Sequence, residues 1–308
     1  MANTALAGSK KRKSNVKFWH REGFVGYMFM IPTLIGFSVF VAYPLIVSMY
    51  TAFTEWDSVN PPQWVGLENF KYIFTQDPVF YKSVGVTFLY VIYTVPISLL
   101  LGMALAVLLN KSLPGIRIFR TLYYLPAITP AVASLVLWMF IYKSDTGILN
   151  LFLSNIGLPK VGWLTDPKVV LISLGIIKFW GVGSMMIIFL SGLQSVPVDV
   201  YEAADLDGAN GWQKFWKITF PLITPIFFLQ LVTGLIGAFQ AFNEAAIMTK
   251  GGPNYASHLL SYEIYLSAFT NYKFGLATAE VWVLFFIIMI FTVIVFSKSE
   301  QYVYYENE

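Results

Sequence analysis

Long apolar runs, separated by short polar stretches that contain glycine, proline or charged residues, dominate the 308-residue chain. Several of these runs exceed the roughly 20 residues that cross a ~30 Å hydrocarbon layer as an α-helix. Together with the punctuation between them, the runs predict six membrane-spanning helices. The predicted spans cover residues 24–50, 84–110, 119–142, 169–195, 218–247 and 275–297. We therefore expect an all-α membrane protein with six transmembrane helices.

Composition supports this class and excludes others. Hydrophobic residues make up 57% of the chain and charged residues 12%, whereas soluble domains carry roughly a quarter charged residues. The absence of cysteine excludes disulfides and cysteine-cluster metal sites, and two histidines leave little for a His-rich site. We expect no bound metal and no nucleic-acid partner.

The distribution of Lys and Arg predicts the orientation, because cytoplasmic segments carry an excess of them. With a cytoplasmic N-terminus, the inner segments hold twelve of the 20 cations, the outer loops hold seven, and Lys178 falls inside a span. Six of the twelve lie in a basic leader, followed by an apolar run too long for a signal peptide. The predicted organisation is a leader over 1–23, a membrane domain over 24–297 and a tail over 298–308, with both termini cytoplasmic.

The least apolar segment in the second half is EAADLDGANGWQKFWKITFPLITP, residues 202–225, on the predicted cytoplasmic side. Pro197 suits a first helical turn, residues 198–206 contain no helix breaker, and Gly208 can end a helix in the left-handed conformation. A second helix is predicted from Gly211, and residues 197–217 form the predicted loop. A helix-turn-helix here is either an interfacial connector or a docking element for a cytoplasmic partner.

This segment resembles the signature loop of ABC importer permeases, in which EAA, a glycine, an isoleucine and a proline have fixed spacing. Those positions are Glu202, Ala203, Ala204, Gly208, Ile218 and Pro221. Phe220 stands where the family usually has leucine. A second EAA at residues 244–246 lacks the rest of the pattern, because Lys250 replaces the glycine and Glu263 replaces the proline.

The resemblance extends over residues 24–297, through stretches such as "IPTLIGFSVFVAYPLIVSMYTAFTEWD", "FRTLYYLPAITPAVASLVLWMFIY" and "IMTKGGPNYASHLLSYEIYLSAF". These are similar to the first permease of maltose-type carbohydrate importers. The resemblance implies the type I ABC importer permease fold, with a cytoplasmic coupling helix between helices 4 and 5. It also implies a location in a bacterial or archaeal inner membrane.

The same resemblance implies the partners. A second permease chain would complete the pore, two ATPase subunits would receive the coupling helix, and an extracytoplasmic sugar-binding protein would deliver a sugar or oligosaccharide. Glu202 would contact the ATPase, Ala203 and Ala204 would permit close seating, and Gly208 would shape the turn. The chain has no GxxxxGK[ST] phosphate loop, so we expect it to be no enzyme, with ATP and Mg²⁺ bound by the ATPase.

Polar residues within apolar helices are candidates for the substrate path, because such groups are costly in lipid. The candidates are Lys178, Trp180, Gln240, Asn243 and Glu244. Lys178 would suit an anionic sugar, or would instead pair with Glu244 or Glu280 for structural reasons. Gln240, Asn243 and Glu244 are spaced to share one helical face, as a pocket wall or as an interhelical contact. Tyr262 and Glu263 are weaker candidates.

Two further expectations concern packing and class. Gly175, Gly181, Gly183 and Gly192 are expected to allow close helix packing rather than to bind a ligand. The alternative functions are a secondary transporter acting alone and a membrane-embedded enzyme. The first would show paired repeats and the second a catalytic motif such as HExxH or GxSxG, and neither is found in the sequence.

Overall fold

The computed structural model describes residues 22–111 and 113–298, and the chain divides into two compact units, residues 1–50 and 51–308. The first unit is a continuous helical stretch of α1 (Glu22–Phe37), the π-helical turn η2 (Ser38–Ala42) and most of α2 (Tyr43–Thr51). Residues 26–51 are long and apolar enough to cross a membrane. Most side chains from 26 to 50 are exposed on this helical stretch. The basic leader falls almost entirely outside the described residues.

The second unit begins with a two-stranded antiparallel hairpin, which the all-α prediction did not include. Strands β1 (Thr54–Glu55) and β2 (Gln63–Trp64) pair Thr54 with Trp64. Helix α3 (Glu68–Thr75) follows, and Asn69 Nδ2 donates hydrogen bonds to the carbonyl oxygens of Ala52 and Thr54 at 3.0 and 2.9 Å. The hairpin is therefore fastened to α3 by one amide side chain.

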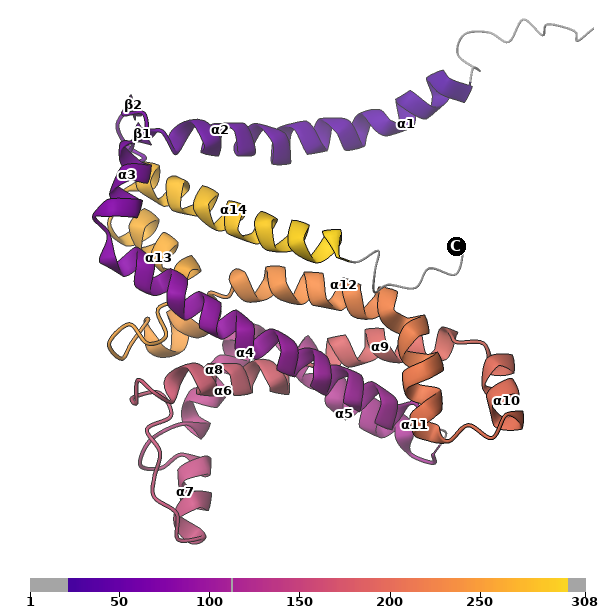
Figure 1. The fold of residues 1–308 in the computed structure, drawn as a ribbon. Helices are drawn as coiled ribbons and strands as arrows, with labels where there is room; N and C mark the ends of the chain where they lie inside the picture. The colour runs from indigo at the N-terminus through magenta and orange to yellow at the C-terminus, as the bar shows by residue number, and fades with distance from the viewer. Residues whose placement is uncertain (1–21, 112, 299–308) are drawn as a thin grey trace, which may run out of the picture. The chain divides into compact units, whose positions relative to one another are not determined.

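Helix α4 (Pro78–Leu109) runs through the centre of this unit (Figure 1). Asp77 caps its first turn by accepting hydrogen bonds from the amides of Val79 and Phe80 at 2.9 and 3.0 Å, and Pro78 occupies the first helical position. Its hydroxyl side chains at Ser83, Thr87 and Thr94 bond back to the carbonyl four residues earlier, so they are satisfied in an apolar core. The remaining helices pack around it.

Two predicted spans are bent pairs rather than continuous helices. Helices α5 (Ile116–Ile128) and α6 (Ala131–Ile141) meet at 99°, and α8 (Val170–Trp180) and α9 (Gly183–Ser195) meet at 46°. Pro130 and Gly181 lie at the two breaks, where a proline or a glycine interrupts a helix at least cost. Among the described residues, four helices can cross a membrane, or up to six if each bent pair counts as one span.

The remaining elements complete the second half of the chain. They are α7 (Ile148–Asn155), α10 (Val198–Leu206), α11 (Gly211–Lys214), η3 (Phe215–Thr219), α12 (Phe220–Phe239), η4 (Ala245–Thr249), α13 (Leu260–Tyr265), η5 (Leu266–Thr270) and α14 (Phe274–Ser297). Helix α14 matches the predicted span 275–297 almost residue for residue. The predicted span 218–247 is too long, because α12 ends at Phe239.

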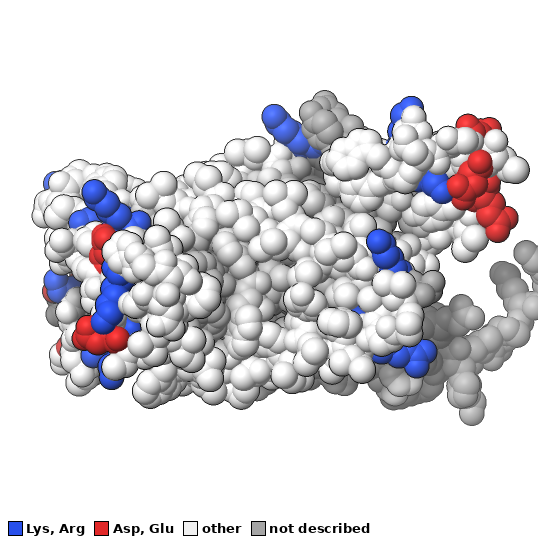
Figure 2. Space-filling view, turned by 90° about the horizontal axis from the view of Figure 1, so that it is seen from below, with Lys and Arg blue, Asp and Glu red and all other residues white. Residues whose placement is uncertain are grey.

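Charged side chains gather at two ends of the visible face and leave an uncharged band between them (Figure 2). We call the end with β1, β2, α3 and α13 the hairpin end, and the end with α10 and α11 the α10 end (Figure 1). An uncharged band between charged ends is the pattern of a protein that crosses lipid. The chain is a multi-pass membrane protein.

Three of the four glycines predicted to allow close packing do so. A Cβ added at Gly175 would collide with the Tyr93 hydroxyl, one at Gly192 would lie 2.3 Å from Ile226 Cδ1, and one at Gly183 would lie 2.1 Å from the Tyr123 carbonyl oxygen. The Gly183 contact is the least able to relax, because the neighbour is backbone. Helix α9 can therefore approach α5 only with glycine at this position.

Gly183→Ala should lower the thermal unfolding temperature of the purified chain, because overpacking against backbone costs about 1–3 kcal/mol. Gly85→Ala is the matched control, since a Cβ at Gly85 meets nothing within 4 Å in helix α4. The control should leave stability unchanged or raise it by up to about 1 kcal/mol. Equal unfolding temperatures for both variants would contradict the close approach of α9 to α5.

Candidate coupling helix and transport path

Helix α10 ends in the turn that its sequence predicts. Gly208 has φ +75°, its amide donates to the Asp205 carbonyl at 3.1 Å, and the Ala209 amide donates to the Ala204 carbonyl at 2.9 Å. These two bonds form a Schellman motif, in which a residue in the left-handed conformation ends the helix. Glycine adopts this conformation without a steric penalty, which explains its position here.

Two side-chain contacts connect α10 with the segment that enters α12. The Lys214 ammonium forms an ion pair with Asp205 Oδ1 at 2.5 Å, and the Tyr201 hydroxyl lies 2.8 Å from Thr219 Oγ1. Helix α11 starts with a capping box between Asn210 and Gln213, as the prediction of a helix near Gly211 anticipated. Helix α10 is therefore connected to α11 and η3 by side chains as well as by the loop.

The exposed surface of α10 combines acidic side chains with the apolar Val198, Val200 and Leu206. Asp199, Glu202 and Asp207 are exposed. Among the described residues, Asp205 is the one acid of this helix that forms an ion pair. Ala203 is exposed, whereas Ala204 is buried and packs inward, so only Ala203 can face a partner. Ile218 in η3 and Pro221 in the first turn of α12 are half-buried. Red acidic side chains are visible at the α10 end (Figure 2).

The second EAA sequence lies elsewhere. Glu244 follows the C-terminal end of α12, whereas α10 precedes its N-terminal end. Ala245 is fully buried in a hydrophobic cluster with Tyr90 and Ile177, and Ala246 packs against that cluster. This copy cannot present the surface that Glu202 and Ala203 present.

Lys178 lies in the last turn of α8, directly before the break at Gly181. It is exposed in the isolated chain, and no ion pair joins it to Glu244, Glu280 or any other carboxylate of the described residues. Trp180 is 40% exposed and stacks edge-on against Trp138, with ring centroids 5.9 Å apart. The last turn of α8 thus carries a cation that forms no ion pair among the described residues and, two positions later, a partly exposed tryptophan.

The three polar residues of the predicted fifth span do not share one helical face, because the helix ends at Phe239. Gln240 caps α12 and lines a groove of about 430 Å³ against α14, with Ile236 and Val281. Asn243 is exposed and Glu244 half-buried in the next segment. The neighbours Ala245 and Ile177 pack in the same cluster, which brings this segment close to the end of α8 that carries Lys178.

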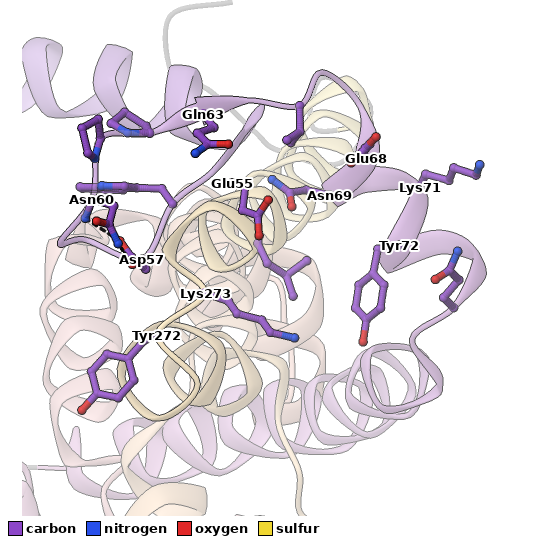
Figure 3. A pocket seen from close by; sticks show the side chains of 16 residues that line it. Glu55, Asp57, Asn60, Gln63, Glu68, Asn69, Lys71, Tyr72, Tyr272 and Lys273 are labelled. Carbon is purple, nitrogen blue, oxygen red and sulfur yellow. Dashed lines mark hydrogen bonds between the residues drawn. The ribbon is translucent and has the colours of Figure 1, made fainter.

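A larger pocket, of about 970 Å³, lies at the hairpin end (Figure 3). Its lining combines acids, bases and amides. The labelled residues are Glu55, Asp57, Asn60, Gln63, Glu68, Asn69, Lys71, Tyr72, Tyr272 and Lys273. The pocket is shaped by the hairpin, α3 and the start of α14, where the Gly275 amide donates to the Trp56 carbonyl at 3.1 Å. We refer to it as the hairpin pocket.

Asp57 holds the tip of the hairpin in place. Its Oδ1 accepts hydrogen bonds from the amides of Asn60 and Val59 at 2.8 and 2.9 Å, and its Oδ2 accepts from Asn60 Nδ2 at 2.6 Å. The hydrogen bond from the Asn60 amide lowers the pKa of Asp57, followed by the bond from Val59. The carboxyl therefore remains ionised at the mouth of the pocket.

One cluster of functional groups was missed by the sequence. Asp77, Glu263 and Glu280 bring carboxylate oxygens within 4.8 Å of one another, although they lie far apart in the chain. The sequence suggested Glu263 only as a weak substrate candidate and Glu280 only as a partner for Lys178, whereas Glu280 accepts a hydrogen bond from Ser267. Nothing in local spacing could have found this cluster.

The described residues form a helical, multi-pass membrane protein with an exposed, capped helix, α10, at one end. Comparison with known proteins identifies the family. The chain is 38% identical over 306 residues to a probable ABC transporter permease protein, YesP, of Bacillus subtilis strain 168, with 98% of each chain covered. It is 30% identical over 284 residues to the trehalose/maltose transport system permease protein MalF of Thermococcus litoralis, with 90% and 94% covered.

A solved structure shows the same architecture. It is a bacterial ABC transporter involved in the import of the acidic polysaccharide alginate, with a TM-score of 0.80, 25% identity, and 90% and 96% of the two chains covered. Residues 78–301 match the family described as binding-protein-dependent transport system inner membrane component. The chain belongs to this family, and its resemblance to carbohydrate ABC importer permeases is confirmed.

Gly208→Val should loosen the end of α10. A β-branched residue with positive φ is strained by roughly 1–2 kcal/mol, which corresponds to about a tenfold faster exchange of the Gly208 and Ala209 amides. Gly211→Val is the control, since Gly211 is equally exposed but lies outside the left-handed region. Hydrogen–deuterium exchange of peptides covering 198–219 measures the effect. Unchanged exchange in Gly208→Val would mean that the turn does not depend on glycine.

Proposed function

We propose that the chain forms half of the translocation pore of an ATP-driven carbohydrate importer. It pairs with a second permease chain, receives sugar from an extracytoplasmic binding protein, and rests on a cytoplasmic ATPase through α10. Both termini are then cytoplasmic, and the hairpin end faces outward. The observation that carries this proposal is the exposed, Schellman-capped α10 with the full spaced motif, in a chain of this family.

The charge of α10 supports a protein partner over a lipid one. Cytoplasmic leaflets carry anionic lipids, which attract Lys and Arg and repel carboxylates. The exposed acids Asp199, Glu202 and Asp207 are therefore unfavourable against headgroups. A protein cleft with basic side chains would accept them, and complementary charge would fix the orientation of docking. Trp212 and Trp216, both exposed, suit the headgroup region beside it.

Glu202→Lys should abolish transport-coupled ATP hydrolysis while leaving membrane insertion intact, because a cation would face the basic ATPase cleft. The measurement is sugar-stimulated ATPase activity of the assembled transporter in proteoliposomes. Glu68→Lys, an exposed acid at the hairpin end, is the matched charge-reversal control and should retain coupling. Normal uptake in Glu202→Lys would remove the coupling role from α10.

Lys178 and the helix break next to it carry the proposal for the transport path. A cation exposed in the isolated chain, without a carboxylate partner among the described residues, is costly in lipid and so belongs at a water-filled cavity. Interrupted helices commonly flank such cavities, because irregular backbone is tolerated only where protein or water covers it. We place Lys178 at the pore between the two permease chains.

An exposed ammonium group in the pore favours an anionic cargo, and the solved relative that imports an acidic polysaccharide gives the same indication. Trp180 offers a face on which a sugar ring can stack, and Asn243 and Glu244 would bind hydroxyl groups. We therefore propose an oligosaccharide with carboxylate groups as the substrate class. Gln240, on the side toward α14, is a weaker candidate for contact with it.

Lys178→Ala should raise the KM for uptake of a uronate oligosaccharide about tenfold or more, because a charge-assisted hydrogen bond contributes about 1.5–3 kcal/mol. Uptake of a neutral oligosaccharide should change little, and Lys178→Arg should retain most of the affinity. Lys168→Ala, a cation that lies before α8, is the control. Unchanged uronate uptake in Lys178→Ala would exclude an anionic cargo held by this residue.

A further inference from the structure

Three buried carboxylates meet near the hairpin pocket. Asp77 caps α4, Glu263 belongs to α13, and Glu280 belongs to α14, with exposed fractions of 7%, 9% and 0%. One carboxylate oxygen from each lies within 4.8 Å of the others. Helix α13 packs against both α4 and α14, so the cluster stands where three helices meet. None of the three is part of the coupling helix or the Lys178 region.

The protein supplies too little positive charge for this cluster. Among the described residues, one ion pair involves this cluster. It joins His258 Nε2 to Glu263 Oε2 at 2.5 Å. Lys273 lies nearby, but it forms no ion pair and its ammonium faces the Tyr72 ring at 5.9 Å. Even a protonated His258 leaves two of the three carboxylates uncompensated. Buried charges without partners are strongly destabilising.

One carboxylate oxygen of the cluster has no hydrogen-bond partner among the described residues. Glu280 Oε1 accepts a hydrogen bond from Ser267 Oγ at 3.0 Å, whereas Glu280 Oε2 is buried and has no partner among the described residues. A buried carboxylate oxygen without a donor points to a ligand that the polypeptide does not provide. Asp77 is already fixed, because its Oδ1 accepts from the amides of Val79 and Phe80.

The spacing of the oxygens matches one class of ligand. Calcium binds carboxylate oxygens at about 2.3–2.6 Å, so two oxygens that share the ion lie at most about 5 Å apart. The 4.8 Å limit of this cluster satisfies that condition for all three pairs. His258 would hold Glu263 in orientation from outside the coordination sphere, as neighbours of metal-ligating carboxylates commonly do.

We infer that Asp77, Glu263 and Glu280 bind a divalent, oxygen-preferring cation, Ca²⁺, which joins the ends of α4, α13 and α14 at the hairpin end. The bound charge of +2 compensates the two carboxylates that His258 leaves unpaired. Gln76 and Leu276, which line the hairpin pocket, lie one and four residues from Asp77 and Glu280 and indicate the side from which the ion enters. This site departs from the sequence-based expectation of no metal.

A bound ion would stabilise the contact between these helices, whichever sugar the protein transports. The ion would fasten the start of α4 to the start of α14 and to the segment after η4. The residue before Asp77 and the start of α14 also line the hairpin pocket, through Gln76, Lys273 and Leu276. In the orientation proposed above, the site faces the outer medium, where Ca²⁺ sites with dissociation constants on the order of 10⁻⁴–10⁻³ M are common.

The test uses the full-length chain in lipid nanodiscs, stripped with EGTA and then supplied with 10 mM CaCl₂, MgCl₂ or KCl. Tryptophan fluorescence reports thermal unfolding, and inductively coupled plasma mass spectrometry reports bound calcium. Calcium should raise the unfolding temperature of the wild type by about 5 °C, with one ion bound per chain. Glu68→Gln, an exposed acid of the hairpin pocket, should behave in the same way.

Glu280→Gln keeps the shape of the side chain and removes one charge. In EGTA it should unfold at a higher temperature than the wild type, because repulsion within the cluster is relieved, and calcium should add nothing. Asp77→Asn keeps an oxygen for the amides of Val79 and Phe80 and should weaken calcium binding at least tenfold. The inference is overturned if the wild type binds no calcium, if KCl stabilises it equally, or if Glu280→Gln retains the calcium shift.

Discussion

Within the uncharged band, every backbone N–H and C=O group needs a partner inside the protein, because lipid offers none. The chain meets this requirement with long helices and with hydrogen bonds at helix ends and breaks. The Arg120 guanidinium donates twice to the Leu109 carbonyl at the end of α4, at 3.1 and 2.7 Å. The amides of Gly181 and Val182 return to carbonyls in the last turn of α8. Helix breaks that are satisfied internally can persist at membrane depth, and one of them carries Lys178.

Because charged groups are costly in lipid, most charged side chains lie at the α10 end and the hairpin end. At the α10 end, the turn at Gly208, the Asp205–Lys214 ion pair and the Tyr201–Thr219 contact connect an exposed acidic helix to α12. At the hairpin end, a pocket with mixed charge lies beside three buried carboxylates. Helix α12 runs from the α10 end to Phe239, after which the chain continues into the segment with Glu244. In the function proposed above, this helix would connect the partner-binding end with the substrate path.

Features fixed by neighbouring residues could be predicted from the sequence, and features fixed by distant ones could not. Helix α10, its left-handed end at Gly208 and the start of α11 depend on residues a few positions apart, and all three predictions are confirmed. The breaks at Pro130 and Gly181 were missed because apolar length alone does not show whether a proline or glycine bends a span. The cluster of Asp77, Glu263 and Glu280 depends on packing between helices far apart in the chain.

The central claim, that α10 is the element seated on the ATPase, can be tested directly because the chain contains no cysteine. A single cysteine at Ala203, which is exposed on α10, can carry a maleimide-linked photoreactive group. In the assembled transporter, illumination should link this position to the ATPase, with a yield that changes when ATP binds. A cysteine at Ala246, in the second EAA sequence, should give no such product. Linkage to the ATPase from Ala246 and not from Ala203 would contradict the account.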